Sequence, residues 1–174
     1  MQTSRVLIID DDLILLDTLA STLRLRLPDV HIETIDSALS ALERIRATEY
    51  AVIVCDGHQP RMEGVAFVRF VRKIHAEQPV LLLIEKSDQD LIRQAIDAGV
   101  YDIVVKPIDE GLFLLAVQRA LEASGLRGQV KREEERLLST VQRVMKDLEV
   151  LYGADGLQAH FEAFMNSVEA ERTK

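Results

Sequence analysis

Short apolar runs alternate with longer amphipathic segments over the first two-thirds of the chain. A run of four to six apolar residues is typical of a buried strand, whereas apolar positions three or four residues apart are typical of a helix. The runs predict strands at Arg5–Ile9, Val30–Thr34, Ala51–Cys55, Val80–Ile84 and Asp102–Val105. The amphipathic segments predict helices at Leu13–Leu25, Ser37–Thr48, Gly64–His75, Gln89–Ala98 and from Glu110 to about Ala123. Such regular alternation favours an α/β fold with a parallel sheet between two layers of helices.

The composition of the runs indicates which strands are buried and which lies at an edge. The first, third and fifth runs are almost wholly apolar, as expected for strands buried on both faces. The second run, Val30–Thr34, alternates apolar and polar residues and therefore fits an edge strand. We predict a doubly wound five-stranded sheet in the order 2-1-3-4-5, in which the first and third strands are neighbours.

Charged residues stand where three of these runs end. Asp10 and Asp11 follow the first run, Asp56 follows the third, and Lys106 follows the fifth. Because the carboxyl ends of parallel strands meet at one edge of the sheet, these side chains are expected to converge. Carboxylate oxygens suit Mg²⁺, and we expect Asp11 and Asp56 to bind it directly and Asp10 to bind it directly or through a water. The main-chain carbonyl of His58 is the candidate for a further ligand. Phosphoryl transfer to Asp56 is the chemistry that such a site favours, with Lys106 paired to a phosphoryl oxygen.

Three motifs together resemble the receiver domain of bacterial two-component response regulators, and the resemblance covers roughly residues 4–124. They are Ile9-Asp10-Asp11, Asp56-x-x-x-Pro60-x-Met62-x-Gly64 and Lys106-Pro107. The resemblance implies a flavodoxin-like fold and a requirement for Mg²⁺. It also implies phosphorylation of Asp56 by a histidine kinase, a histidine phosphotransfer protein or a small donor such as acetyl phosphate. Receivers of this family usually catalyse their own dephosphorylation.

Two positions depart from the pattern of the family. Where the family has Thr or Ser at the end of the fourth strand, this chain has Ile84, and where it has Tyr or Phe in the fifth strand, this chain has Ile103. Tyr101 is two residues before Ile103 and is expected on the same face of the strand. These departures leave a second interpretation open, a pseudo-receiver that works as a binding or oligomerisation module without phosphorylation.

A third interpretation is a haloacid-dehalogenase-type phosphatase, which also uses an aspartate and Mg²⁺. Asp10 and Asp12 have the spacing of its nucleophile and second aspartate. However, no insertion large enough to form a cap over a substrate interrupts the βα units, and Asp56 ends the third strand instead. The receiver is therefore the preferred interpretation.

Residues 125–174 contain no strand pattern and predict a helical extension to a receiver domain at residues 1–124. Arg127–Tyr152 is expected to be one helix, residues 153–156 a turn, and the following residues a second helix. Apolar residues recur at steps of four and three along the first helix, as in a coiled-coil seam: Leu137, Val141, Val144, Leu148 and Leu151. We expect this extension to form a homodimer or to bind a partner.

Charge and composition restrict the partners and the compartment. The 174 residues carry a net charge of −8, and residues 126–174 hold eight Lys and Arg against nine Asp and Glu. Because DNA binding depends on neutralising phosphates, we expect no DNA-binding output. The chain has one cysteine, no apolar run of about 20 residues and no signal-peptide pattern, so we expect a cytoplasmic protein without membrane contact.

Overall fold

The chain forms a five-stranded parallel sheet in the computed structural model, which describes the backbone of residues 4–172 and the side chains of residues 4–150. The strands are β1 (Arg5–Ile9), β2 (His31–Ile35), β3 (Val52–Asp56), β4 (Val80–Glu85) and β5 (Asp102–Lys106). The helices are α1 (Leu13–Arg26), α2 (Ala38–Ala47), α3 (Gly64–Ile74), α4 (Gln89–Asp97) and α5 (Glu110–Arg172). Asp56 and Lys106 are thus the last residues of their strands, so β3 and β5 each end one residue later than the sequence pattern predicts.

The strand order is β2-β1-β3-β4-β5, which confirms the predicted flavodoxin-like topology. The prediction that the fifth strand is buried on both faces is wrong, because β5 lies at the sheet edge and Val105 is 40% exposed. β4 lies inside the sheet, between β3 and β5, and its apolar residues are buried. β1 and β3 are paired in parallel, with Ile9 opposite Cys55, so the residues that follow them meet at one edge.

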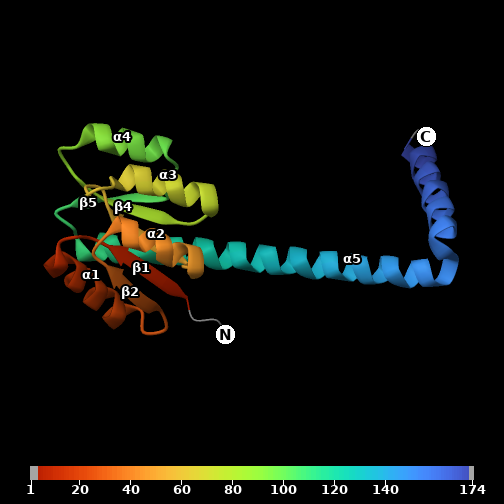
Figure 1. Ribbon diagram of the computed structural model, residues 1–174, viewed down its shortest axis with the longest axis horizontal. Helices are drawn as coiled ribbons and strands as arrows, with labels where there is room; N and C mark the ends of the chain where they lie inside the picture. Colours follow the sequence, from red (N-terminus) through yellow and green to blue (C-terminus); the bar gives the residue numbers. More distant parts are fainter. Residues whose placement is uncertain (1–3, 173–174) are drawn as a thin grey trace. The chain divides into compact units, whose positions relative to one another are not determined.

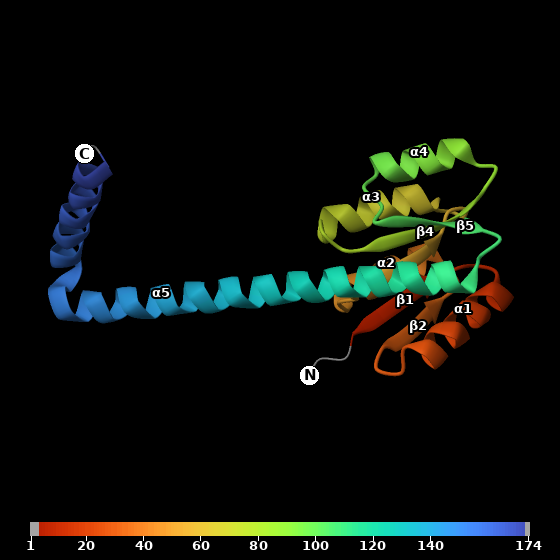
Figure 2. The same cartoon turned by 180° about the vertical axis from the view of Figure 1, so that it is seen from behind.

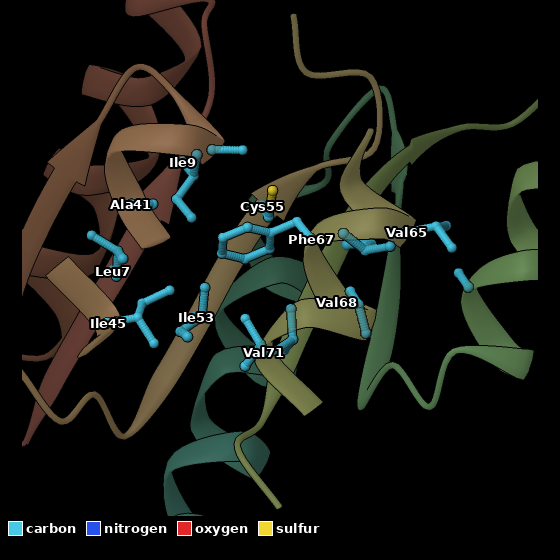
Figure 3. Close-up of a cluster of buried hydrophobic side chains, with 14 of the residues drawn as sticks. Leu7, Ile9, Ala41, Ile45, Ile53, Cys55, Val65, Phe67, Val68 and Val71 are labelled. Atoms are coloured by element: carbon cyan, nitrogen blue, oxygen red, sulfur yellow. The ribbon is translucent and has the colours of Figure 1, made fainter. Parts of the chain in front are cut away.

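Helices cover both faces of the sheet (Figures 1 and 2). On one face α2, α3 and α4 pack against alternate residues of β1, β3 and β4. Figure 3 shows this cluster, in which the ring of Phe67 on α3 lies beside Ile53 and Cys55 of β3. On the other face α1 and the first turns of α5 pack against the remaining residues, with Phe113 fully buried. Cys55 is likewise buried, which agrees with a purely structural thiol.

Aspartates begin three of the helices by accepting hydrogen bonds from first-turn amides. Asp12 Oδ1 accepts from Ile14 N and Leu15 N at the start of α1, as typical N-cap residues do. Asp88 caps α4 and Asp109 caps α5 in the same way. By contrast, Ser37 precedes α2 without a side-chain bond to its amides.

α5 differs from the prediction for the end of the chain. It continues through Gly125, where the sequence pattern indicates an end near Ala123 and a new helix at Arg127. A glycine inside a helix costs only about 1 kcal/mol relative to alanine, and no proline stands nearby to stop the helix. The expected turn at residues 153–156 is reduced to Gly153, whose backbone (φ 70°, ψ 165°) is non-helical.

The chain divides into a first compact unit that ends at Arg127 and a second that begins at Gly128. Within the second unit, the described part of the predicted seam is largely exposed: Leu137 (60%), Val141 (57%) and Val144 (48%). Leu151, which completes the predicted seam, lies outside the described side chains. Among the described residues, no helix combines the length and the apolar character needed to cross a bilayer.

Candidate functional site

Three carboxylates meet at the carboxyl edge of the sheet. Asp10 and Asp11 directly follow β1, Asp56 ends the neighbouring β3, and one carboxylate oxygen of each lies within 4.8 Å of the other two. This convergence follows from the parallel pairing of β1 with β3, as the sequence predicts. Asp10 and Asp56 are buried, whereas Asp11 is exposed, so the cluster opens to solvent on the side of Asp11.

Asp10 is the most deeply buried of these carboxylates, with 1% of its surface exposed. Its Oδ1 accepts a hydrogen bond from Asp12 N at 2.9 Å, while its Oδ2 has no hydrogen-bond partner. Burial raises the pKa of Asp10 above its ordinary value, and the negative charge of Asp56 adds to this effect. A buried acceptor without a partner is costly, and such a group usually has a functional reason.

Lys106 brings the positive charge of the site from the end of β5. Its Nζ lies 2.6 Å from Asp56 Oδ1 and 3.7 Å from Asp10 Oδ2. Burial lowers the pKa of Lys106, but the hydrogen bond to Asp56 and the charges of both carboxylates outweigh burial and raise its pKa above the ordinary value. The ammonium group is therefore held in its charged form beside the two buried carboxylates.

His58 connects the loop after β3 to the start of α4. Its main-chain N donates to Asp56 Oδ2 at 3.0 Å, and its ring Nε2 lies 2.8 Å from Asp88 Oδ2. Asp88 Oδ1 accepts from Leu91 N, and this bond is the main reason that the pKa of Asp88 lies below its ordinary value. The ring is thus paired with Asp88, which leaves the main-chain carbonyl as the group of His58 for the predicted ligand role.

Gln59 is a site residue that the sequence reasoning missed. It is 5% exposed, its Oε1 accepts from Ala38 N at 3.1 Å, and its Nε2 donates to Asp11 Oδ1 at 3.4 Å. Loop residues have no periodicity from which burial can be predicted, so the only available signal was the place of Gln59 within the Asp56–Gly64 motif.

Two glycines let the loop return close to β3. A Cβ atom on Gly64 would lie 2.6 Å from the main-chain oxygen of Asp56, and one on Gly57 would lie 2.9 Å from a methyl group of Leu91. The main-chain N of Gly57 donates to Leu83 O, which continues the pairing of β3 with β4 past Asp56. The absence of side chains at these positions therefore allows the loop to pack against the strand that carries Asp56.

Ile84 and Ile103, the two positions at which this chain departs from the pattern of the family, both pack against apolar side chains. Ile84 is 1% exposed, and Ile103 packs against the same cluster of buried residues. The expectation that Tyr101 shares a face with Ile103 is wrong. Tyr101 packs on the opposite face of the sheet, and its hydroxyl donates to Arg119 O at 3.2 Å. Tyr101 lies before β5 begins, where strand alternation does not apply.

Comparison with known proteins places this site in a family. The family model described as response regulator receiver domain matches residues 6–118. The chain is 33% identical over 124 residues to the C4-dicarboxylate transport transcriptional regulatory protein DctD of Pseudomonas aeruginosa, covering 71% of this chain and 26% of that protein. It is 30% identical over 128 residues to the hydrogenase transcriptional regulatory protein HoxA of Cupriavidus necator, covering 73% of this chain and 26% of that protein. The chain therefore spans about a quarter of the length of these relatives.

Solved structures show the same similarity. The receiver domain of NtrX from Brucella abortus is 28% identical, with a TM-score of 0.63 over 67% of this chain and 98% of that one. The chemotaxis response regulator CheY4 of Vibrio cholerae is 25% identical, with a TM-score of 0.63 over 69% of this chain and all of that one.

Proposed function

Because this chain belongs to the response regulator receiver domain family, we propose that it accepts a phosphoryl group on Asp56 and signals through protein–protein contacts. Its receiver domain is assigned to residues 1–124 and its helical extension to residues 125–174. The observation that carries the proposal is the ion pair of Lys106 Nζ with Asp56 Oδ1 at 2.6 Å, beside the carboxylates of Asp10 and Asp11. This arrangement combines an oxygen nucleophile, a fixed positive charge and a set of oxygen ligands within one small volume.

The residues present suit a divalent cation. Asp10, Asp11 and Asp56 would hold Mg²⁺, together with the main-chain carbonyl of His58, and the partnerless Oδ2 of Asp10 is an oxygen for which a cation supplies the missing contact. When bound, Mg²⁺ offsets negative charge on the transferring phosphoryl group. An all-oxygen donor set of this kind favours Mg²⁺ over softer metals.

Asp56 is the nucleophile in the proposed transfer. One of its carboxylate oxygens forms a bond to phosphorus, the bond between phosphorus and the donor atom breaks, and the electron pair of that bond leaves with the donor. Lys106 then exchanges its contact with the Asp56 carboxylate for one with a phosphoryl oxygen. The main-chain N of His58, which donates to Asp56 Oδ2, fixes the rotation of the carboxylate before the transfer.

A histidine kinase or a histidine phosphotransfer protein is the expected donor, and the cytoplasm is the expected compartment. A phosphohistidine side chain needs direct access to Asp56, and the open side of the cluster at Asp11 provides it. A groove of about 600 Å³ lies along the exposed edge of β5 and is lined by residues of β5 and α5, including Ile103, Val105, Leu112 and Lys106. Because Lys106 belongs to both this groove and the acidic site, a partner bound there would contact a residue that responds to phosphorylation.

We assign homodimerisation to the helical extension. Leu137, Val141 and Val144 are exposed on one stripe of α5, and such a stripe is stabilised when a second helix covers it. Sedimentation of the full chain at micromolar concentration is expected to show a dimer, and Val141→Glu to shift it to a monomer. Ser139→Glu, an exposed position outside the stripe, is the matched control. A monomeric wild-type protein would contradict the assignment.

Intact mass measured after incubation with acetyl phosphate tests the central proposal. The expected result is a gain of one phosphoryl group that requires Mg²⁺ and is absent in Asp56→Asn. A folded wild-type protein that gains no mass, while a control receiver does, would contradict the proposal. Such a result would support the pseudo-receiver, in which the chain acts as a binding or oligomerisation module.

A further inference from the structure

Gln59 is a buried polar side chain with a hydrogen bond at each end. In the described part of the chain, the buried polar or charged residues are Asp10, Asp56 and Gln59. The two aspartates belong to the proposed phosphoryl site, whereas no role has been given to Gln59. Its amide lies between the first residue of α2 and Asp11, so it connects the loop after β3 to a second element and to the cluster.

The orientation of this amide is determined by its partners. The main-chain N–H of Ala38 can only donate, so the amide oxygen of Gln59 must face it, and the NH₂ group must then face Asp11 Oδ1. Ala38 is the first residue of α2, and Gln59 therefore satisfies one of the first-turn N–H groups that have no partner within the helix. The side chain is held at both ends and is buried, so it cannot rotate without losing a bond.

The bond to Asp11 has a chemical consequence for the cluster. Asp11 is exposed, and the amide of Gln59 is its side-chain hydrogen-bond partner among the described residues. The amide fixes one oxygen of Asp11 while adding no positive charge, so the carboxylate keeps its full negative charge for a cation. Lys106, in contrast, partly neutralises the two carboxylates that it contacts. Asp11 would thus be oriented without being weakened as a ligand.

We propose that Gln59 is a positioning residue that holds Asp11 ready for the divalent cation. The inference rests on the proposed function, because it assigns to Asp11 a cation that the phosphoryl transfer uses. Its consequence is that the affinity for the cation depends on a side chain that does not itself contact the cation.

Gln59→Met tests the inference because methionine has a similar length but forms neither hydrogen bond. Electron paramagnetic resonance of free Mn²⁺ measures the affinity of the full chain for a divalent cation. We expect Mn²⁺ binding to weaken by about threefold to tenfold, the effect of losing one hydrogen bond of ordinary net strength, because the bond from Gln59 to the exposed Asp11 is long. Gln118→Met, an exposed glutamine on α5, is the matched control and is expected to leave the affinity unchanged.

Two further readouts separate positioning from a general loss of stability. The rate of phosphorylation by acetyl phosphate should fall in Gln59→Met at low Mg²⁺ and return to the wild-type rate at saturating Mg²⁺. Combined with Asp11→Asn, the Gln59→Met change should cause no additional loss of Mn²⁺ affinity, because the effect acts through Asp11.

Equal Mn²⁺ affinity in wild type and Gln59→Met would overturn the inference, as would an undiminished effect of Gln59→Met in the Asp11→Asn background. Either result would leave the proposed function intact. A wild-type protein that binds no Mn²⁺ and accepts no phosphoryl group would overturn both.

Discussion

Asp10→Asn is expected to stabilise the metal-free protein, although Asp10 belongs to the proposed cation site. The carboxylate is buried, and its Oδ2 has no hydrogen-bond partner. Asparagine keeps an oxygen to accept the bond from Asp12 N and removes the buried charge. The change therefore removes the buried charge while retaining the hydrogen bond that starts the loop after β1.

The expected magnitude follows from three charge interactions and the cost of burying the carboxylate. At an effective dielectric constant of about 20, the attraction of Asp10 to Lys106 over 3.7 Å is about 4.5 kcal/mol. On the same basis, its repulsion from Asp56 over at most 4.8 Å is at least about 3.5 kcal/mol. These two nearly cancel, and the repulsion from Asp11 reduces the difference further. What remains is the desolvation cost of a buried carboxylate with one oxygen left without a hydrogen bond. Because the NH₂ group of asparagine retains part of this cost, we expect Asp10→Asn to raise the free energy of unfolding by about 1–2 kcal/mol.

Hydrogen exchange of amides in β1, β3 and β4 measures this free energy without interference from the helical extension. The comparison is made first with a chelator present and then with excess Mg²⁺. Binding of the cation stabilises the wild-type protein by mass action, so the order of stability should reverse in Mg²⁺. Asp11→Asn, which alters an exposed carboxylate, is the control and should change the metal-free stability much less. If Asp10→Asn proved less stable than wild type with the chelator present, the reasoning would be refuted.

Hydrogen exchange measured as a function of pH tests whether the buried charge of Asp10 causes the difference in stability. The pKa of Asp10 in the folded protein is raised above 3.8, so the folded state binds this proton more tightly than the unfolded state. The ionised carboxylate therefore costs stability above the folded pKa and costs nothing well below 3.8. The advantage of Asp10→Asn should accordingly shrink as the pH falls from neutral towards 3.8. An advantage that stays constant over this range would point to a cause other than the buried charge.

Three other changes, one of them with a matched control, test the site and the residues that support it. Lys106→Met should slow phosphorylation by acetyl phosphate by about 100-fold, as measured by intact mass, and an unchanged rate would remove Lys106 from the transfer. In urea unfolding, Gly64→Ala should lower the free energy of unfolding by about 1–3 kcal/mol because its Cβ would meet a main-chain oxygen of β3. Gly125→Ala, at a helical position with open space around it, is the control and should raise the free energy of unfolding by about 1 kcal/mol in the same experiment. His58→Ala should speed hydrogen exchange in the first turn of α4 because it removes the partner of Asp88, and unchanged exchange would show that this contact does not support the helix.

The sequence alone allowed the sheet order and the convergence of the carboxylates to be predicted because both depend on strongly patterned segments. Aspartates stand at the carboxyl ends of the apolar strands β1 and β3. Because the two strands pair in parallel, these aspartates must lie at the same edge of the sheet. The start of α1 was equally predictable because Asp12 is a typical N-cap residue. Where the pattern is periodic or the capping residue is local, a strand or helix is specified by its own residues.

The sequence-based predictions were wrong where the hydrophobic pattern stops or where the residues that would end a helix are weak signals. Tyr101 lies outside β5, so strand alternation predicts its face wrongly, and the apolar residues of β5 indicate burial on both faces although this strand lies at the sheet edge. Gly125 weakens a helix without ending it, and the continuity of α5 therefore could not be predicted from propensity. Gln59 is buried through contacts with α2 and Asp11, both distant in the sequence.

The formal charges of the acidic cluster and Lys106 determine which cation can neutralise the site. Asp10, Asp11, Asp56 and Lys106 carry a formal sum of −2, which one divalent cation brings to electroneutrality and a monovalent cation does not. Phosphorylation replaces one carboxylate with a group that carries roughly one more negative charge. That charge is sensed within about 8–10 Å at moderate ionic strength, a range that reaches a partner surface docked over the site. An electrostatic signal of this kind needs no hydroxyl at Ile84 and no ring at Ile103, so a receiver without them can still report its state.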